Sequence, residues 1–342
     1  MDIPQAPHEP LPRRNSLFFG RFGLRAGYGI AIFIVVAFLL IIASLLAGLA
    51  ASGQLKDAIA LYSFAKIHPH APRPHFDLRF LPSLVIVNDG VMFFGLLATC
   101  CFFSKGERRP LRAYGIGGYR APYIVAGAFW GIVMMGAMVA VLHAGHWLVF
   151  DGRLLHGTPA VTYGLAWLFA FLLTGLSEEY TFRGYLQYSL MRGVWRLAEI
   201  ISPTNTRAVA FWIAAAITSL LFAFAHTGNS GENFIGLAQV FFAGVAFVYA
   251  LWRTGSLWWS IGFHMTWDWA QSYLFGVADS GNVSIGRLFA THPAGNIVYS
   301  GGTAGPEGSI FAPIALLITI LIIRFTTRPG TQPVLEQEPA RD

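Results

Sequence analysis

The chain contains few charged residues. Of its 342 residues, 12% are charged and 55% are hydrophobic, whereas soluble domains carry about 25% charged residues. This composition excludes an ordinary soluble globular protein. No soluble segment is long enough to form a second core, so the apolar part is expected to be one domain.

Several signatures are also missing. The two cysteines, Cys100 and Cys101, are adjacent, and neighbours on a helix point about 100° apart, which excludes an ordinary disulfide. No zinc-finger spacing, H-E-x-x-H motif or phosphate loop occurs. Ser177 lacks the glycine context of a serine nucleophile elbow. The absence of an internal repeat leaves the inverted-repeat plan of many transporters without support.

Long apolar runs dominate what remains. A membrane helix needs about 20 apolar residues, and the sequence predicts an all-α polytopic bundle of about eight transmembrane helices around a polar intramembrane cavity. Polar connections are expected at 51–80, 105–122 and 276–308. The transmembrane domain is predicted over 27–325, between a disordered N-terminus (1–26) and a disordered tail (326–342). The eight predicted spans are 27–50, 81–104, 123–149, 160–187, 208–226, 234–252, 257–275 and 309–324.

The basic residues indicate the orientation. With eight spans, sixteen of the 23 Lys and Arg residues lie on the side that holds both termini and six on the other. Positive loops stay in the cytoplasm, so both termini are predicted there. The net charge of +6 is thus explained by topology and by contact with the lipid bilayer, and nucleic acid is not an expected partner. The same pattern favours a bacterial inner (plasma) membrane.

Two adjacent glutamates, Glu178 and Glu179, lie in the fourth span, followed by Arg183. A charged group at the centre of a membrane helix costs about 2.5–3.5 kcal/mol on insertion scales, so a functional role is expected for at least one. Glu179 and Arg183 are at i and i+4 and can pair. Glu178 faces elsewhere and stays free for proton transfer. The alternative is a paired cluster at a helix end.

Two later spans carry histidines. His226 ends the fifth span, and His264 and Asp268 are at i and i+4 on the seventh. That pair suits a metal site or a histidine oriented by an acid. Alternatively, each of these polar side chains only forms a hydrogen bond within its own helix and has no role in a shared site. Taken together, acid and imidazole groups on three spans favour one wet cavity, because polar groups within spans face each other or water.

The motifs E-E-x-x-x-R, F-x-x-x-H and H-x-x-x-D resemble the signature of the CAAX protease and bacteriocin-processing family of intramembrane proteases. This family includes the Ras-converting CAAX endopeptidases and the bacterial Abi proteins. The resemblance covers about 120–275. It implies that Glu178 and His226 activate water, and that Glu179 and Arg183 support them. By the same resemblance, His264 and Asp268 stabilise the oxyanion or bind metal.

One position departs from the resembling endopeptidases, which typically have Asn where this chain has Asp268. Asn donates a hydrogen bond to an oxyanion and an ionised Asp does not. Asp268 is therefore protonated, orients His264 or serves a metal. A divalent ion such as Zn, held by Glu178, His226, His264 and Asp268, would lower the pKa of its bound water towards about 7. The metal-free alternative stays open.

The predicted depths of the histidines disagree. His264 lies seven residues from the start of its span, or roughly 10 Å, whereas His226 lies nearly twenty residues beyond Arg207, or roughly 28 Å. Either the fifth helix projects from the membrane before entering it, or the helices tilt.

The sequence therefore predicts an intramembrane endopeptidase that acts on a membrane-associated or lipidated protein or peptide. The alternative is a non-catalytic immunity or scaffold protein with the same fold. A weaker alternative is an ion-coupled transporter that uses Asp89. This mid-span residue either lines the cavity, binds a cation or packs against a partner.

Overall fold

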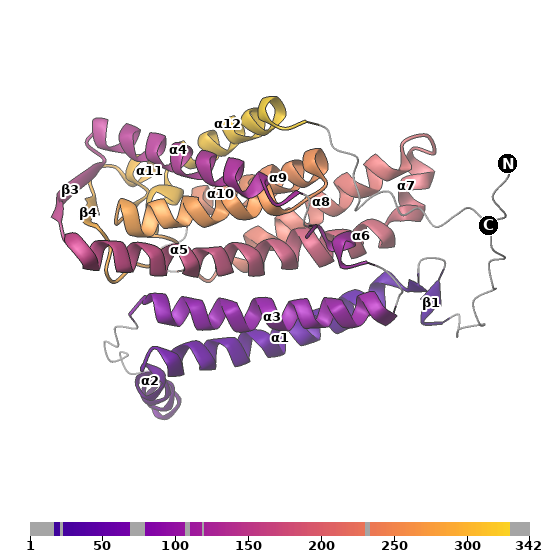
Figure 1. Ribbon diagram of the computed structural model, residues 1–342, viewed down its shortest axis with the longest axis horizontal. Coiled ribbons are helices and arrows are strands. Elements are labelled where there is room, and N and C mark those ends of the chain that lie inside the picture. Colours follow the sequence, from indigo (N-terminus) through magenta and orange to yellow (C-terminus); the bar gives the residue numbers. More distant parts are fainter. Residues whose placement is uncertain are drawn as a thin grey trace.

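The computed structural model describes residues 17–20, 23–68, 79–106, 110–117, 120–229 and 233–328. It is an all-α polytopic membrane fold, as predicted (Figure 1). Six helices in the described ranges are long and apolar enough to cross a membrane. They are α1 (Ala26–Ala51), α3 (Pro82–Gly106), α4 (Tyr123–Ala144), α5 (Gly157–Glu179) with its continuation to Gly193, α8 (Thr206–Ala225) and α9 (Phe234–Thr254).

The seventh and eighth predicted spans are helical but shorter. They correspond to α10 (Trp258–Trp269), which runs on into the π-helix η4 (Ala270–Leu274), and to α12 (Phe311–Thr326). The 16 residues of α12 extend about 24 Å, less than the roughly 30 Å of a hydrocarbon core. Length and composition therefore identify six spans in the described part of the chain, with two shorter apolar helices packed among them.

The first and last helices place their outer ends together. In Figure 1, α1 begins on the right, where α6 (Gln187–Gly193) and α7 (Trp195–Ile201) also lie, and α12 runs towards the same side of the bundle. Because the start of the first helix and the end of the last lie towards the same side, the arrangement fits an even number of membrane crossings. The predicted disordered ends, 1–26 and 326–342, fall mostly outside the described residues. Within the first of them, β1 (Phe19–Gly20) pairs with β2 (Gly23–Leu24).

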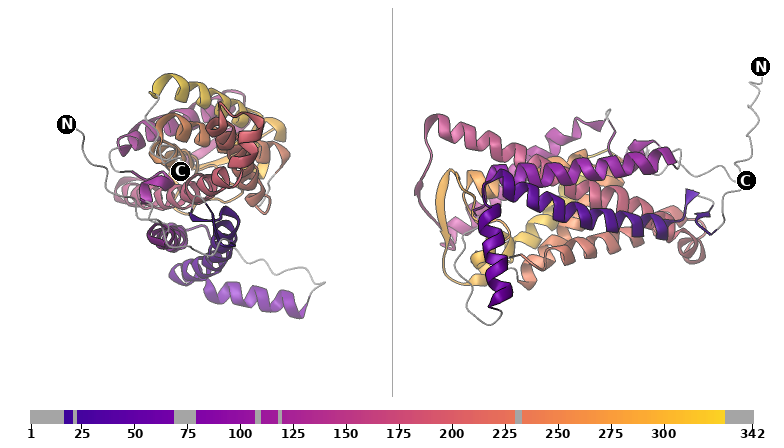
Figure 2. Two further views of the ribbon diagram at one scale, coloured as in Figure 1. Left: turned by 90° about the vertical axis from the view of Figure 1, so that its right-hand side faces the viewer. Right: turned by 90° about the horizontal axis from the view of Figure 1, so that it is seen from below.

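The three predicted polar connections contain regular structure. Segment 51–80 carries α2 (Leu55–Ile67), which lies across the ends of α1 and α3 (Figure 2). Segment 105–122 contains the 3₁₀ turn η1 (Leu111–Tyr114). Segment 276–308 holds β4 (Phe289–Pro293), which pairs antiparallel with β3 (Leu148–Arg153), then α11 (Ile297–Ser300) and the 3₁₀ turns η5 (Gly302–Ala304) and η6 (Pro306–Gly308). These short elements have no long periodic pattern to reveal them.

Helix α10 lies between α4 and α5 (Figure 1). Gly127 and Gly131 form a G-x-x-x-G face on α4, and an added Cβ at Gly127 would lie 2.0 Å from the carbonyl oxygen of Trp259. Thr266 donates a hydrogen bond across this contact to the carbonyl of Ala128 (2.8 Å). Small residues let membrane helices approach closely. This packing occupies one face of α10 and leaves His264 on another face, towards α5.

The two helices that carry the motif acids, α5 and α10, change to π geometry within two residues of those acids. The π-helix η3 (Tyr180–Leu186) begins after Glu179, and η4 begins two residues after Asp268. Single π turns are rare and frequently occur at functional sites. The helix that starts as α5 therefore continues past the glutamates and does not end there.

Candidate active site

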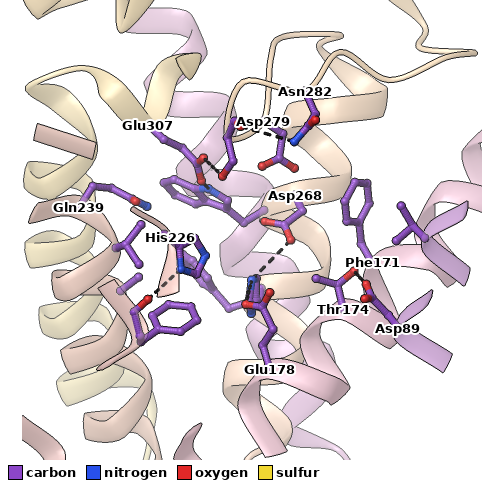
Figure 3. A pocket seen from close by; sticks show the side chains of 18 of the residues that line it. Asp89, Phe171, Thr174, Glu178, His226, Gln239, Asp268, Asp279, Asn282 and Glu307 are labelled. Carbon is purple, nitrogen blue, oxygen red and sulfur yellow. Dashed lines mark hydrogen bonds and ion pairs between the residues drawn. The ribbon is translucent and has the colours of Figure 1, made fainter. Parts of the chain in front are cut away.

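A cavity of about 300 Å³ lies within the bundle. Figure 3 shows Glu178, His226 and Asp268 directed into it from α5, the end of α8 and α10, and His264 also lines it. The structure thus brings the four predicted catalytic residues to one cavity. Apolar side chains such as Leu84, Phe171 and Val240 form much of its remaining wall.

The two glutamates have different surroundings. Glu179 is completely buried, and its Oε1 accepts a hydrogen bond from Nη1 of Arg183 at 3.0 Å. The Glu178 side chain is 31% exposed, and its Oε2 accepts no hydrogen bond from any described residue. The predicted pairing of Glu179 with Arg183 is present, and the side chain of Glu178 lines the cavity and is partly exposed.

His264 contacts three carboxyl groups. Its Nδ1 lies 3.2 Å from Oε1 of Glu179. Its Nε2 lies 3.5 Å from Oδ2 of Asp268 and 3.8 Å from Oε2 of Glu178. A carboxylate bonded to one ring nitrogen fixes the tautomer and the ring orientation. Glu179 therefore positions His264, and the second nitrogen points to the other two acids.

The tautomer of His226 follows from its backbone contact. Its Nδ1 lies 2.8 Å from the carbonyl oxygen of Phe222, and a carbonyl only accepts hydrogen bonds. The proton of the neutral ring is therefore on Nδ1. The lone pair is on Nε2, as a base for water activation requires.

Phe222, the first residue of the F-x-x-x-H motif, supports the site in a second way. Its ring centroid lies 3.9 Å from the guanidinium carbon of Arg183, 4.6 Å from the ring centroid of His226 and 6.5 Å from that of His264. A cation over an aromatic face is attracted by the ring quadrupole. One aromatic side chain thus contacts residues of all three motifs.

Pairing along the helices resolves the depth discrepancy. Thr218 of α8 donates to Oε1 of Gln187 at 3.0 Å, which sets these residues at one level. Glu178 lies nine residues before Gln187 and His226 eight after Thr218, or about 13 and 12 Å along helices that run in opposite directions. The first turns of α8 lie beside α6, which continues η3. The fifth helix therefore starts well before the level of Gln187, and His226 at its end reaches the level of Glu178.

Residues 160–270 match the family model described as type II CAAX prenyl endopeptidase Rce1-like. The resemblance inferred from the motifs, to CAAX endopeptidases, is confirmed over these residues. No curated protein and no solved structure matches the chain. The Rce1-like segment contains all six predicted site residues, so the match and the cavity involve the same side chains.

The four catalytic candidates are also the predicted metal ligands. Within the described ranges, no three His, Cys, Asp or Glu side chains are grouped so that they could hold an ion. As placed, Glu178, His226, His264 and Asp268 do not form such a set. The divalent metal stays a prediction, and no chemical step is derived through it.

Asp89 both lines the cavity and has partners. Its Oδ1 accepts from Asn88 at 2.7 Å, and its Oδ2 accepts from Thr174 of α5. Asp89 therefore both lines the cavity and packs against a partner, which are two of the three alternatives given for it. Its hydrogen bonds connect α3 to α5 next to the motif.

Two further acids line the cavity outside the Rce1-like segment. Asp279 and Glu307 come from the 276–308 segment (Figure 3). Burial raises the pKa of Asp279 to about 6, and burial with the nearby Asp279 charge raises that of Glu307 to about 7. Sequence reasoning missed both, because they occur in a Gly- and Ser-rich stretch with no motif around them.

Proposed function

We propose that the protein is an intramembrane endopeptidase that hydrolyses peptide bonds with water activated by Glu178 and His226. The observation that carries the proposal is the convergence of these side chains with His264 and Asp268 on one cavity inside a membrane bundle. The match to the Rce1-like family supports the same reaction class.

Glu178 and His226 act on the water. An attacking water binds between the carboxylate of Glu178 and Nε2 of His226 and loses a proton to that carboxylate. The apolar wall around it limits bulk water, which strengthens the electrostatic interactions of the site. The proton then passes to the leaving amine, so that Glu178 serves first as base and then as acid.

His264 acts on the substrate carbonyl. As an imidazolium among three carboxyl groups, it donates from Nε2 to the developing oxyanion, in a cavity where such a donor is worth far more than in water. Glu179 keeps the opposite nitrogen engaged. Asp268, 3.5 Å from Nε2, orients and balances the ring; of the three roles considered for this Asp, its position supports this one.

The substrate is a membrane-associated or lipidated protein or peptide. Support comes from the location of the cavity in a multi-pass bundle and from its apolar wall. The excess of basic residues on the terminal side supports cytoplasmic termini. A bacterial inner membrane remains our proposed location.

The test compares purified Glu178→Gln with Glu199→Gln, a change at an exposed hydrogen-bonded glutamate on α7. We expect Glu178→Gln to remain folded and to lose peptidase activity by a factor of about 10² or more, the range for a general base. Glu199→Gln should behave as wild type. Full activity in Glu178→Gln would overturn the proposal. If cellular function survives without cleavage, the immunity or scaffold alternative is favoured.

A further inference from the structure

Asp279 and Glu307 are held near the catalytic side chains by residues of the catalytic helix itself. Trp267, next to Asp268, donates from Nε1 to Oε1 of Glu307 at 3.2 Å. Ser272 of η4 donates to Oδ2 of Asp279 at 2.8 Å. The two carboxyl groups are thus fixed relative to the same helix that carries His264, on loops that close one end of the cavity.

The loop backbone brings the two acids together. Gly305 has φ +93, and a Cβ at this position would lie 2.0 Å from the carbonyl oxygen of Ala278. Glycine permits both this left-handed conformation and the close approach. The residue next to Asp279 therefore packs directly on the turn that precedes Glu307.

A third polar group lines the same cavity without a partner. Gln239 of α9 is 4% exposed, and its Oε1 accepts no hydrogen bond from any described residue. Figure 3 shows its amide end directed into the cavity. Leaving a buried acceptor without a donor is unfavourable, so a bound donor is expected to satisfy it.

We propose that Asp279, Glu307 and Gln239 form a subsite for an organic cation, the ammonium or guanidinium of a Lys, Arg or amino terminus near the scissile bond. All three offer acceptor oxygens, and nearby Glu178 and Asp268 add negative charge. A free carboxylate would be repelled at this end of the cavity. The identification of the cation as part of a substrate rests on the proposed peptidase function.

The arrangement of the acidic side chains favours an organic cation over a metal ion. No three acids, histidines or cysteines of the described residues form a group that could hold a metal. A guanidinium has five N–H donors on a planar fork and can bridge acceptors that lie farther apart. Glu307 also accepts from Ser280 at 3.5 Å and from Gln271. Because each carboxylate oxygen has two lone pairs, Asp279 and Glu307 retain acceptor capacity beyond their bonds within the protein.

The activity test uses a random peptide library presented to the protein in lipid nanodiscs. Mass spectrometry of the products should show Lys or Arg enriched at one fixed position from the cleaved bond. A peptide with Arg there should then be cleaved with a kcat/KM about ten-fold above its citrulline analogue, the size expected for one charge-assisted hydrogen bond. Equal cleavage of the two peptides would overturn the subsite.

Substitutions test whether Asp279 and Glu307 cause the preference for Arg. Glu307→Gln and Asp279→Asn should each remove most of the Arg preference through KM, measured as the ratio of kcat/KM for the Arg and citrulline peptides. Asp151→Asn is the matched control, since Asp151 is 44% exposed and pairs with His292 on the two-stranded β3–β4 sheet. Loss of cleavage of both peptides by Glu307→Gln would assign a structural role and overturn the subsite.

A binding test separates the subsite from the peptidase proposal. Calorimetry should show N-acetylarginine amide binding to the wild-type protein, and N-acetylcitrulline amide binding about ten-fold more weakly. If no peptide is cleaved but this difference is present and is lost in Glu307→Gln, the subsite holds and the peptidase proposal fails. Equal binding of the two amides would overturn the subsite whatever the activity. Binding of Mg²⁺ or Zn²⁺ alone that depends on the same two acids would instead assign an inorganic cation site.

Discussion

Nδ1 of His264 lies 3.2 Å from Oε1 of Glu179, the same oxygen that accepts a hydrogen bond from Arg183 at 3.0 Å. One buried carboxylate therefore connects a cation on its own helix to an imidazole on another. The two glutamates of the motif therefore have different roles. Glu179 organises the site, and Glu178 faces the cavity.

Replacing Glu179 by Gln should destabilise the protein. The Arg183 side chain is fully buried, and removal of one partner of a buried ion pair leaves an uncompensated charge that costs about 3–5 kcal/mol. We expect a lower thermal unfolding midpoint in detergent and loss of activity. Adding Arg183→Met to this variant should restore part of the stability, because the double variant buries no unpaired charge. An unchanged midpoint in the single variant would contradict the assigned role.

The convergence of the motifs was predictable from the sequence. Charged groups are costly in hydrocarbon, so Glu178, His226 and the His264/Asp268 pair had to face one another or water. The i, i+4 spacing also predicted the pair of Glu179 with Arg183. Such inferences need only helix geometry and the membrane as solvent.

The depth of His226 was not predictable in the same way. The length of an apolar run predicts the extent of a span, but it does not predict how far that helix is displaced along its axis relative to its neighbour. The pairing of Thr218 with Gln187, which sets that level, involves two ordinary polar residues. Asp279 and Glu307 were missed for a related reason, because a loop acid becomes part of a cavity only through the tertiary path of its loop.

Phe222→Leu should impair the site even though an apolar side chain is kept. Leucine does not reproduce the ring under Arg183, and a desolvated cation–π contact is worth about 2 kcal/mol. The lipid-facing Phe224, 71% exposed, gives the matched control Phe224→Leu, which should change stability little. Thermal unfolding and peptide cleavage measure both effects. Equal behaviour of the two variants would show that the Phe222 ring does not support the site.

Asp268→Asn should preserve much of the activity, within about ten-fold of wild type. The amide oxygen can still accept from Nε2 of His264, and the amide N–H can donate to the oxyanion. Asp268→Ala removes both interactions and should lose at least ten-fold more. Steady-state kcat/KM of the two variants shows whether the amide can replace the carboxyl group of Asp268. Equal losses would mean that the negative charge itself is required.

Chelation should leave the activity unchanged. No described trio of acids, histidines or cysteines is grouped to hold an ion, and the proposed water activation uses Glu178 and His226 alone. Metal analysis of the purified protein, followed by assay after dialysis against EDTA, tests this. Stoichiometric zinc together with activity that EDTA removes and zinc restores would favour the metal mechanism instead.

Glu307→Gln should stabilise the protein at alkaline pH. The folded-state pKa of Glu307 is raised to about 7 from an ordinary 4.5, first by burial and then by the nearby Asp279 charge. Between these values the folded protein retains a proton that the unfolded chain releases, so stability decreases as pH rises from about 4.5 to 7 and then levels off.

Glutamine is neutral at every pH and can still accept the hydrogen bond from Trp267. After allowance for screening by water in the cavity, the gain at pH 8 should be about 1–2 kcal/mol, with little change at pH 4.5. Thermal unfolding at both pH values, with Glu199→Gln as the control, measures the difference. A gain of the same size at both pH values would show that Glu307 acts through packing and that its ionisation does not limit stability.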